Sequence, residues 1–310
     1  MYDVTTLGEC LIDLVALAPT ASLYDAPAFA PKPGGAPANV AVGVQRLGKK
    51  AALVGKVGAD DFGLGLRRLL KQEGVSTQFL LTDPASCTTL ALAALTSEGE
   101  ARFTFAVGAH AQLSLAELNT AALAETRILH IGSVSLAHEP VRTTTLSALA
   151  AARRAGLICT YDVNWRPALW PDQAAGLAQA RQPLGQVDIC KMNLAELRML
   201  TGHEEASEGL ASLETVAALV VVTLGAKGCL FRLRGGIHAV AAPSVTALVD
   251  SIGAGDAFMA ALLAFLPAHP SDLAVEEATF LLGRACQAAA ISVTRRGAIP
   301  SLPYAHEIIL

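Results

Sequence analysis

Charged and aromatic side chains are both scarce in this chain of 310 residues, at 16% and 5% of the total. The 23 basic residues do not outnumber the 27 acidic ones, and no more than two of them stand side by side. A surface that follows the phosphates of a nucleic acid needs clustered positive charge, so we expect no nucleic-acid partner. The shortage of rings also disfavours a binding surface built on stacking.

The six cysteines are scattered and include no C-x-x-C pair, which excludes a zinc cluster or a redox dithiol. We expect reduced, mostly buried thiols. The start of the sequence lacks a basic leader, and the most apolar runs, such as Ala217–Leu224 and Ala257–Leu266, are too short to span a bilayer. These absences predict a cytoplasmic protein with no membrane partner.

Apolar sequence is abundant, at 53%, and it alternates between strand-like and helix-like stretches. Buried strands are expected at Val4–Leu7, Ala51–Val57, Ile128–Ile131, Ile158–Val163, Asp188–Met192, Leu219–Thr223 and Cys229–Leu233. Helices are expected at Ala36–Leu47 and Asp61–Glu73 and around residues 140–155, 172–181, 194–201, 255–266 and 277–293. This alternation predicts an α/β fold with a mostly parallel sheet covered by helices on both faces.

Two segments, residues 10–33 and 86–107, interrupt the alternation. The second has the pattern of a β-hairpin, with its turn at Ser97-Glu98-Gly99. We interpret both segments as strands of one small lid that folds over a site at the edge of the main sheet. The lid segments are inserted into a single domain that spans residues 1–310.

The most informative segment is 250–258, which reads DSIGAGDAF and leads directly into an apolar helical pattern. Its two glycines permit a tight turn, and a helix that begins there presents free backbone amides and a positive dipole end. Such amides suit the charge that develops on a transferred phosphoryl group. Asp256, beside them, can accept a proton from an attacking hydroxyl. The plainer interpretation is a helix cap next to a turn.

Other phosphate-binding and catalytic motifs are absent. The sequence has no G-x-x-x-x-G-K-[ST], and the turn after the first strand is not G-x-G-x-x-G. It also lacks H-E-x-x-H, G-x-S-x-G and the H-R-D set of protein kinases. A P-loop enzyme is thereby excluded. A Rossmann-type oxidoreductase is disfavoured, although its strands and helices would alternate in a similar way.

Segment 250–258 resembles the C-terminal signature of the ribokinase-like (PfkB) carbohydrate kinases, D-T-x-G-A-G-D-x-F, with Ser251 in place of threonine. Three more segments match that family in order: PGGAPANVA at 33–41, KMNLAE at 191–196 and VTLGAKG at 222–228. The resemblance covers essentially the whole chain. It implies a three-layer α/β/α fold whose central sheet is mostly parallel and carries a small β-sheet lid.

The resemblance also implies roles for individual residues. Asp256 would be the catalytic base, and Gly253, Ala254 and Gly255 would form the anion hole. ATP would be bound by Asn193, Thr223, Gly225 and Gly228, and Mg²⁺ would be held through water by Asn193 and Glu196. The sugar would be bound by Asp13, Gly34, Gly35, Asn39, Phe103, Asn164 and Arg166. A K⁺ ion is a further implied cofactor, at positions Asp250, Ile252, Ser292, Gly297 and Ser301.

Each role also has a structural interpretation. Glu196 would be a solvated acid at a helix start, and Thr223 to Gly228 an ordinary hairpin turn. Asp13 would be a surface acid, and Arg166 part of a structural ion pair. Asn39, on an apolar helix face, would be buried with a real partner under either interpretation.

Three segments are similar to those of fructokinases: GGAPANVAVG at 34–43, DVNWRPALW at 162–170 and SVTRRGAIPS at 292–301. They imply transfer from ATP to a primary hydroxyl of D-fructose. The stretch after Phe105 departs from the pattern, and we interpret His110 there as an exposed loop histidine, with a sugar contact as the alternative. Arg166 would also suit the acidic substrate of a 2-keto-3-deoxygluconate kinase.

Further alternatives are an aminoimidazole riboside or ribose kinase and, in another class, a non-catalytic sugar or nucleotide sensor on the same fold. The lid sheet would also provide a surface for a homodimer, because its outer face and its edges need cover.

Overall fold

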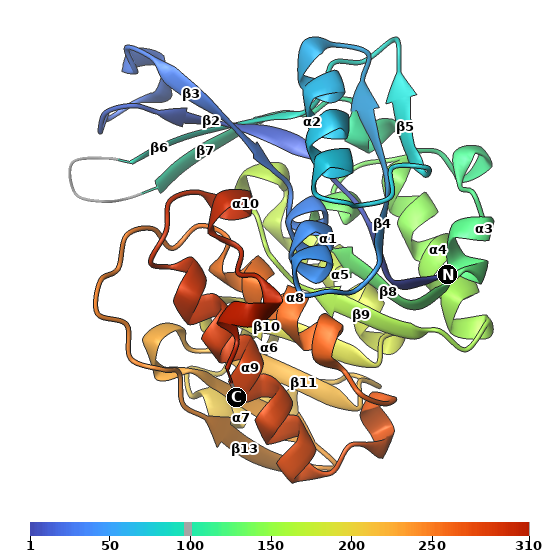
Figure 1. Cartoon of the computed structure of the whole chain (residues 1–310), viewed down its shortest axis with the longest axis vertical. Helices are drawn as coiled ribbons and strands as arrows, with labels where there is room; N and C mark the ends of the chain where they lie inside the picture. The colour runs from blue at the N-terminus through green and yellow to red at the C-terminus, as the bar shows by residue number, and fades with distance from the viewer. Residues whose placement is uncertain (96–100, 310) are drawn as a thin grey trace.

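The computed structural model describes residues 1–95 and 101–309, which form two β-sheets and the helices around them (Figure 1). The turn expected at Ser97-Glu98-Gly99 lies outside the described residues. The order of the larger sheet is β13-β12-β11-β10-β9-β8-β1-β4-β5. Its strands are β1 Tyr2–Leu7, β4 Ala51–Gly58, β5 Leu80–Asp83, β8 Thr126–Gly132, β9 Ile158–Asp162, β10 Ile189–Asn193, β11 Leu219–Thr223, β12 Cys229–Leu233 and β13 Gly236–Val240.

The larger sheet is parallel from β5 through β11, and only β12 and β13 run antiparallel to their neighbours. The prediction of a mostly parallel sheet is therefore confirmed. Strands β5 and β13, which the sequence did not indicate, are its two edges.

Successive residues of the central strands face two separate apolar cores. On β8, for example, Ile128 packs into one core and Leu129 into the other. The first core is covered by α1 Ala36–Arg46, α2 Asp61–Gln72, α8 Ala254–Phe265 and α9 Val275–Ser292. The second is covered by α4 Val141–Arg154, α5 Gln173–Arg181, α6 Leu194–Thr201 and α7 Ala206–Ser212. Burial on both faces explains why the strands are apolar throughout, and it confirms the three layers.

The smaller sheet has the order β3-β2-β6-β7, with β2 Leu11–Ala16, β3 Phe29–Gly34, β6 Leu90–Leu95 and β7 Ala101–Ala106. It draws its strands from both segments that interrupt the alternation, and it projects from the main body (Figure 1). Asp13 pairs with Ala91, and Ala91 pairs with Phe105, so these side chains share one face of the sheet. Phe103 lies on that face one row farther out.

The remaining short helices are α3 Ala121–Ala124 and α10 Ala298–Ser301. All six cysteines are free, and only Cys87 is exposed, which agrees with the expectation of mostly buried thiols. Within the described residues, no helix combines the length and the apolar character needed to cross a membrane.

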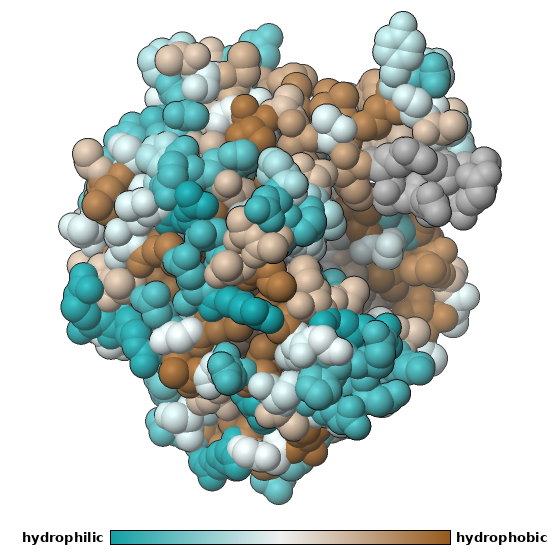
Figure 2. Space-filling model, turned by 180° about the vertical axis from the view of Figure 1, so that it is seen from behind, coloured by the Kyte–Doolittle hydropathy of each residue, from teal (hydrophilic) through white to brown (hydrophobic). Residues whose placement is uncertain are grey.

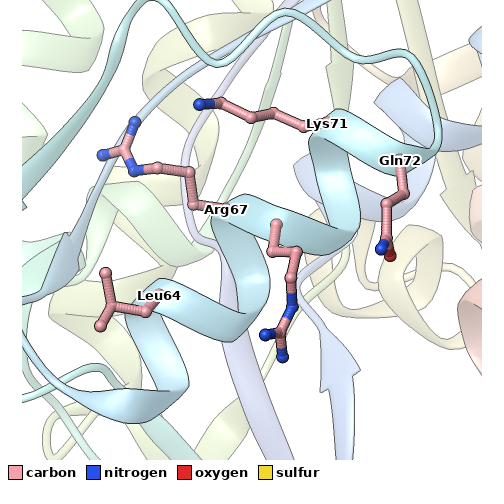
Figure 3. A pocket seen from close by; sticks show the side chains of 5 residues that line it. Leu64, Arg67, Lys71 and Gln72 are labelled. Carbon is pink, nitrogen blue, oxygen red and sulfur yellow. The ribbon is translucent and has the colours of Figure 1, made fainter.

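The surface is hollowed beside the small sheet, as the view from behind shows (Figure 2). A separate shallow depression lies on the outside of α2, between Leu64, Arg67, Arg68, Lys71 and Gln72. The side chains there radiate from successive turns and do not converge on a common point (Figure 3). Arg67 is already engaged by the carbonyl oxygen of Thr77 and the hydroxyl of Thr82. This depression contains none of the predicted site residues.

Candidate active site

The carboxyl ends of the parallel strands lie along one edge of the larger sheet and bring predicted site residues together. Asn193 ends β10 and Thr223 ends β11, and the two residues are directly paired. Asp162 ends the neighbouring strand β9, and Glu9 follows β1. Ligands of open α/β sheets bind at this edge, so the topology places the candidate site here.

The first turn of α8 forms the centre of the site. Gly253 precedes the helix with φ of +83°, and a Cβ atom there would lie 2.8 Å from Cα of Ala298. Only glycine satisfies both the conformation and the space. The helix begins at Ala254, and the amides at the start of a helix favour an anion. The amide of Ala254 also donates to the carbonyl oxygen of Ser251 at 3.3 Å. Gly253, Ala254 and Gly255 thus lie at the helix start where the anion hole is expected.

The Asp256 carboxylate is held from outside its own helix. Its Oδ2 atom accepts a hydrogen bond of 2.7 Å from Nδ2 of Asn39, which lies on α1 and is 4% exposed. Burial raises the pKa of Asp256 to about 6, although the bond from Asn39 lowers it. Because the residue that caps α8 is Gly253, the interpretation of Asp256 as a cap is wrong. The expected buried Asn39 with a real partner is confirmed.

The glycine motif brings Asp13 and Glu9 against the start of α1. Gly35 has φ of +99°, and a Cβ atom there would lie 2.5 Å from the carbonyl oxygen of Glu9. A Cβ atom at Gly34 would overlap the Asp13 carboxylate. Burial raises the pKa of Asp13 to about 6, with nearby Arg166 opposing the rise. Asp13 is half-buried within β2 and does not lie in a turn, so its interpretation as a surface turn acid is wrong.

Glu9 is a charged residue of this site that sequence reasoning missed. It is 2% exposed, and its Oε1 atom accepts a hydrogen bond of 3.0 Å from the backbone amide of Ala36 at the start of α1. Its Oε2 atom is buried without a partner. Burial raises the pKa of Glu9 to about 7, and Asp256 contributes to the rise. The only signal in the sequence was an acid directly after a buried strand.

Asn193 and Glu196 form a capping box at the start of α6. The Oδ1 atom of Asn193 accepts from the amide of Glu196 at 2.9 Å, and Oε2 of Glu196 accepts from the amide of Asn193 at 2.8 Å. The other oxygen of Glu196 accepts from the amide of Trp165 at 2.8 Å. Glu196 is buried, so the interpretation of a solvated acid is wrong.

No cluster of three or more acidic, histidine or cysteine side chains suited to a metal ion occurs in the described parts of the chain. Both carboxylate oxygens of Glu196 and Oδ1 of Asn193 already accept hydrogen bonds from backbone amides, so a Mg²⁺ ion here would reach them through its own water and take its other ligands from phosphates.

The turn between β11 and β12 adjoins this capping box. Thr223 donates its hydroxyl proton to the carbonyl oxygen of Met192 at 3.4 Å, and Gly228 has φ of +95°. The amide of Leu224 donates to the carbonyl oxygen of Gly228 at 2.8 Å, so residues 224–228 do close a hairpin turn. Gly225 lies within this turn, which the sheet places beside Asn193.

A second missed feature is the ion pair of Lys191 and Asp162. Nζ of Lys191 lies 2.8 Å from Oδ2 of Asp162, and both side chains are buried. An ideal Cβ atom at Gly255 would be 3.0 Å from the same Nζ atom. The sequence signal was a charged residue inside each of two apolar strands.

Arg166, Asn164 and Phe103 border the same region. Arg166 is exposed and has no ion pair within the described residues, which contradicts its interpretation as part of a structural pair. Its charge nevertheless lowers the pKa values of Glu9, Asp13 and Asp256. Asn164 has φ of +37°, and Phe103 is 43% exposed.

His110 is not the exposed loop residue that the sequence suggested. It is 2% exposed, and its Nδ1 atom shares a hydrogen bond with the Thr89 hydroxyl, which also accepts from the amide of Gly108. Burial lowers the pKa of His110 to about 3. The histidine therefore joins the start of β6 to the end of β7 at the base of the small sheet. Sequence reasoning failed because the surrounding loop carries no apolar periodicity.

The positions expected to bind K⁺ lie on adjoining segments behind Gly253. Asp250 accepts from the amides of Ile252 at 3.0 Å and Gly297 at 2.9 Å, one with each carboxylate oxygen. The hydroxyl of Ser292 donates to a carbonyl oxygen within α9 at 2.8 Å, and that of Ser301 donates within α10 at 2.7 Å. Asp250 thus joins the loop before α8 to the turn before α10.

Comparison with known proteins identifies relatives along the whole chain. Residues 1–305 match the sequence profile described as pfkB family carbohydrate kinase. Fructokinase-1 of Zea mays is 39% identical over 313 residues, which cover 99% of this chain and 96% of that protein.

Two solved structures are also similar. Fructokinase from Vibrio cholerae O395, with bound fructose, ADP and calcium ion, has a TM-score of 0.85 at 31% identity, over 98% of this chain and 96% of that one. Aminoimidazole riboside kinase from Salmonella enterica, complexed with aminoimidazole riboside and an ATP analogue, has a TM-score of 0.83 at 27% identity, over 99% and 98%.

Proposed function

The chain belongs to the pfkB family of carbohydrate kinases, which phosphorylate sugars with ATP, and we propose that its substrate is D-fructose, phosphorylated at the primary 6-hydroxyl. Two considerations support fructose over the other sugars of the family. The relative from Zea mays is a fructokinase over nearly the full length of both chains. The site also collects the carboxylates of Asp13 and Asp256, which favour a neutral sugar such as fructose over an acidic one such as 2-keto-3-deoxygluconate.

The hydrogen bond between Asn39 and Asp256 is the observation that carries the proposal. It fixes one carboxylate oxygen at the first turn of α8 and leaves the other to face an incoming hydroxyl. The hydroxyl oxygen forms a bond to the γ-phosphorus, the bond from that phosphorus to its bridging oxygen breaks, and ADP leaves. The hydroxyl proton passes to Asp256, and the amides of Gly253, Ala254 and Gly255 bind the charge on the phosphoryl oxygens.

The sugar lies, in this proposal, between the main body and the small-sheet face that carries Asp13. Gly34 and Gly35 let the backbone approach the sugar closely, and Asn39 orients the base. Phe103, Asn164 and Arg166 border the same space. Closure of the small sheet excludes water that would otherwise hydrolyse ATP.

The nucleotide lies along the strand edge beside Thr223, Gly225 and Gly228, with Asn193 next to its phosphates. Asn193 and Glu196 would hold Mg²⁺ through water, and the ion would supply positive charge to the phosphates. The segments of Asp250, Ile252, Ser292, Gly297 and Ser301 would hold a K⁺ ion, which would keep the loop before Gly253 in place. In the same proposal the protein acts in the cytoplasm.

The proposal is tested by ADP release with a panel of acceptors: D-fructose, ribose, aminoimidazole riboside and 2-keto-3-deoxygluconate. We expect the highest kcat/KM for fructose and a product that carries phosphate on the 6-oxygen. A preference for 2-keto-3-deoxygluconate would reassign Arg166 to an acidic substrate. Sugar binding without ADP release from any acceptor would favour a sensor.

The role of the base is tested in the same assay by Asp256→Asn. This variant keeps the shape of the side chain but cannot accept the proton, so we expect kcat to fall by about 10³-fold. Circular dichroism and thermal unfolding should show an intact fold. A variant that retains near-normal kcat would disprove the assignment of Asp256.

A further inference from the structure

A buried ion pair lies next to the first turn of α8 and takes no part in the mechanism described above. Lys191 and Asp162 are directly paired on the neighbouring strands β10 and β9. Their side chains are 7% and 3% exposed, and the distance from Nζ to Oδ2 is 2.8 Å. The pair therefore lies inside the sheet edge, beneath the site and not on its surface.

A buried ion pair fills this space at a high cost in desolvation free energy. Removing two charges from water costs several kcal/mol per ion, and apolar side chains of similar size are often as stable or more so. The other oxygen of Asp162, Oδ1, is buried without a partner. Packing alone therefore does not account for charged residues at these two positions, and perturbed buried charges in a cleft are typical of functional sites.

The position of the lysine nitrogen indicates what that function is. An ideal Cβ atom at Gly255 would lie 3.0 Å from Nζ, so the ammonium group packs directly against the backbone of the proposed anion hole. Burial lowers the pKa of Lys191, but Asp162 and Glu196 outweigh that effect and raise the pKa above its ordinary value. The 2.8 Å contact with the Asp162 carboxylate holds the ammonium group in this position.

We propose that Lys191, anchored by Asp162, is the fixed cation of the phosphoryl-transfer site: it stabilises the negative charge that gathers at the first turn of α8. This inference rests on the proposed function, in which Asp256 is the base and the amides of residues 253–255 bind the transferred group. Lys191 touches that backbone, whereas Asp162 is a positioning residue that acts through the lysine.

The charges around Asp256 predict in which direction each substitution should shift the pKa of this base. Asp256 is faced by Asn39 from α1, Lys191 from β10, Asp162 from β9, Arg166 from the loop after β9, Glu9 after β1 and Asp13 on β2. Among these groups, Asp162 raises the pKa of Asp256 and Lys191 lowers it. Removing the lysine charge should therefore raise the pKa of the base, and removing the Asp162 charge should lower it.

The experiment compares Lys191→Met, Asp162→Asn and the double variant by kcat, by KM for ATP and fructose, and by the pH dependence of kcat/KM. We expect kcat to fall by about 10²-fold in Lys191→Met, as for the loss of one charged donor to a transition state, while KM for fructose changes little. The acidic limb of the profile is the range of pH in which kcat/KM falls because Asp256 becomes protonated. This limb should move to higher pH in Lys191→Met and to lower pH in Asp162→Asn. A merely structural pair would not move the limb in opposite directions.

Lys56→Met provides the control, because the Lys56 side chain is also buried, at 10% exposure, and forms an ion pair of 2.8 Å with the more exposed Glu117 away from the site. We expect that variant to lose stability while its pH profile stays unchanged. If Lys191→Met does not fold, the double variant, in which both partners are neutral, should still show the loss of kcat, and Asp162→Asn should still show the shift to lower pH.

Normal kcat in the lysine variant or the double variant, together with an unmoved limb in Asp162→Asn, would overturn the inference. If Asp256→Asn is inactive at the same time, only the role of Lys191 fails. If Asp256→Asn is active, the proposed function fails instead.

Discussion

Three carboxyl groups around the candidate site share one physical property, a pKa raised by burial. The values are about 7 for Glu9, about 6 for Asp13 and about 6 for Asp256. Each side chain loses hydration in the folded protein, and the shift at Glu9 is increased by the charge of Asp256. The motifs identified Asp13 and Asp256 but not Glu9, because one acid after an apolar strand does not reveal its own burial.

The substitution Glu9→Gln tests this property through stability. The raised pKa means that the folded state binds a proton more tightly than the unfolded state, so stability falls as the pH rises from 4.5 to about 7. Glutamine keeps the acceptor for Ala36 and removes the ionisation. We expect urea unfolding to give similar free energies for the variant and the wild type at pH 5, and a variant more stable by up to about 3 kcal/mol at pH 8.

The exposed Glu214 provides the control, since Glu214→Gln should leave the difference from wild type the same at both pH values. A difference between Glu9→Gln and wild type that stays constant from pH 5 to pH 8 would contradict the burial of an ionisable Glu9.

At the scale of elements, the central strands and long helices were predictable, and the edges of the larger sheet were not. Leu219–Thr223 and Cys229–Leu233 have the bounds that their apolar runs predict. The missed strands β5 and β13 occupy opposite edges of that sheet. An edge strand is defined by the neighbour with which it pairs, and β13 alternates between half-buried and exposed residues. The four residues of β5 and the five residues of β13 therefore carry too little apolar signal to be recognised as strands.

The hairpin formed by β2 and β3 allows a prediction about glycine. Gly34→Ala would place a methyl group on the Asp13 carboxylate, although the backbone of Gly34 itself requires no positive φ. We expect KM for the sugar to rise at least tenfold, since Asp13 must turn away, while the free energy of unfolding falls by about 1–3 kcal/mol. Steady-state kinetics and urea unfolding measure the two effects.

Gly65→Ala on α2 is the matched control, because nothing lies within 4 Å of the added atom. Alanine should leave KM unchanged there and stabilise the helix by up to about 1 kcal/mol. Equal effects of the two substitutions on KM would show that Asp13 does not need the space beside Gly34.

At the scale of the whole molecule, the small sheet is the part with the least cover. It projects from the main body (Figure 1), and large apolar side chains around it are exposed, with Leu17 at 67% and Tyr24 at 94%. Apolar surface next to open strand edges is a favourable place for a second copy of the chain to pack. A second chain bound there would also stabilise the position of the small sheet, which carries Asp13.

We therefore predict a homodimer through the small sheet, measured as a molar mass near twice 32.0 kDa in light scattering at micromolar concentration. Leu17→Glu should weaken the dimer by about tenfold or more, because it places a charge in an apolar contact. Leu64→Glu, at 62% exposure on α2, is the control and should leave the mass unchanged. A monomer in the wild-type protein would refute the prediction.

The sequence by itself determined the layered α/β fold and the family, and it singled out Asp256 as the candidate base. The fold follows from local information, since strand and helix periodicity and the glycines of tight turns are read from neighbouring residues. The family follows from the resemblance of the ordered motifs. Only the tertiary structure decided that Glu9, His110 and the Lys191–Asp162 pair are buried. Burial depends on which distant segments of the chain come together. Asn39 and Asp256 are 217 positions apart in the sequence, yet Nδ2 of Asn39 lies 2.7 Å from Oδ2 of Asp256. The charge on each group follows from that meeting, because hydration and neighbouring charges set its pKa.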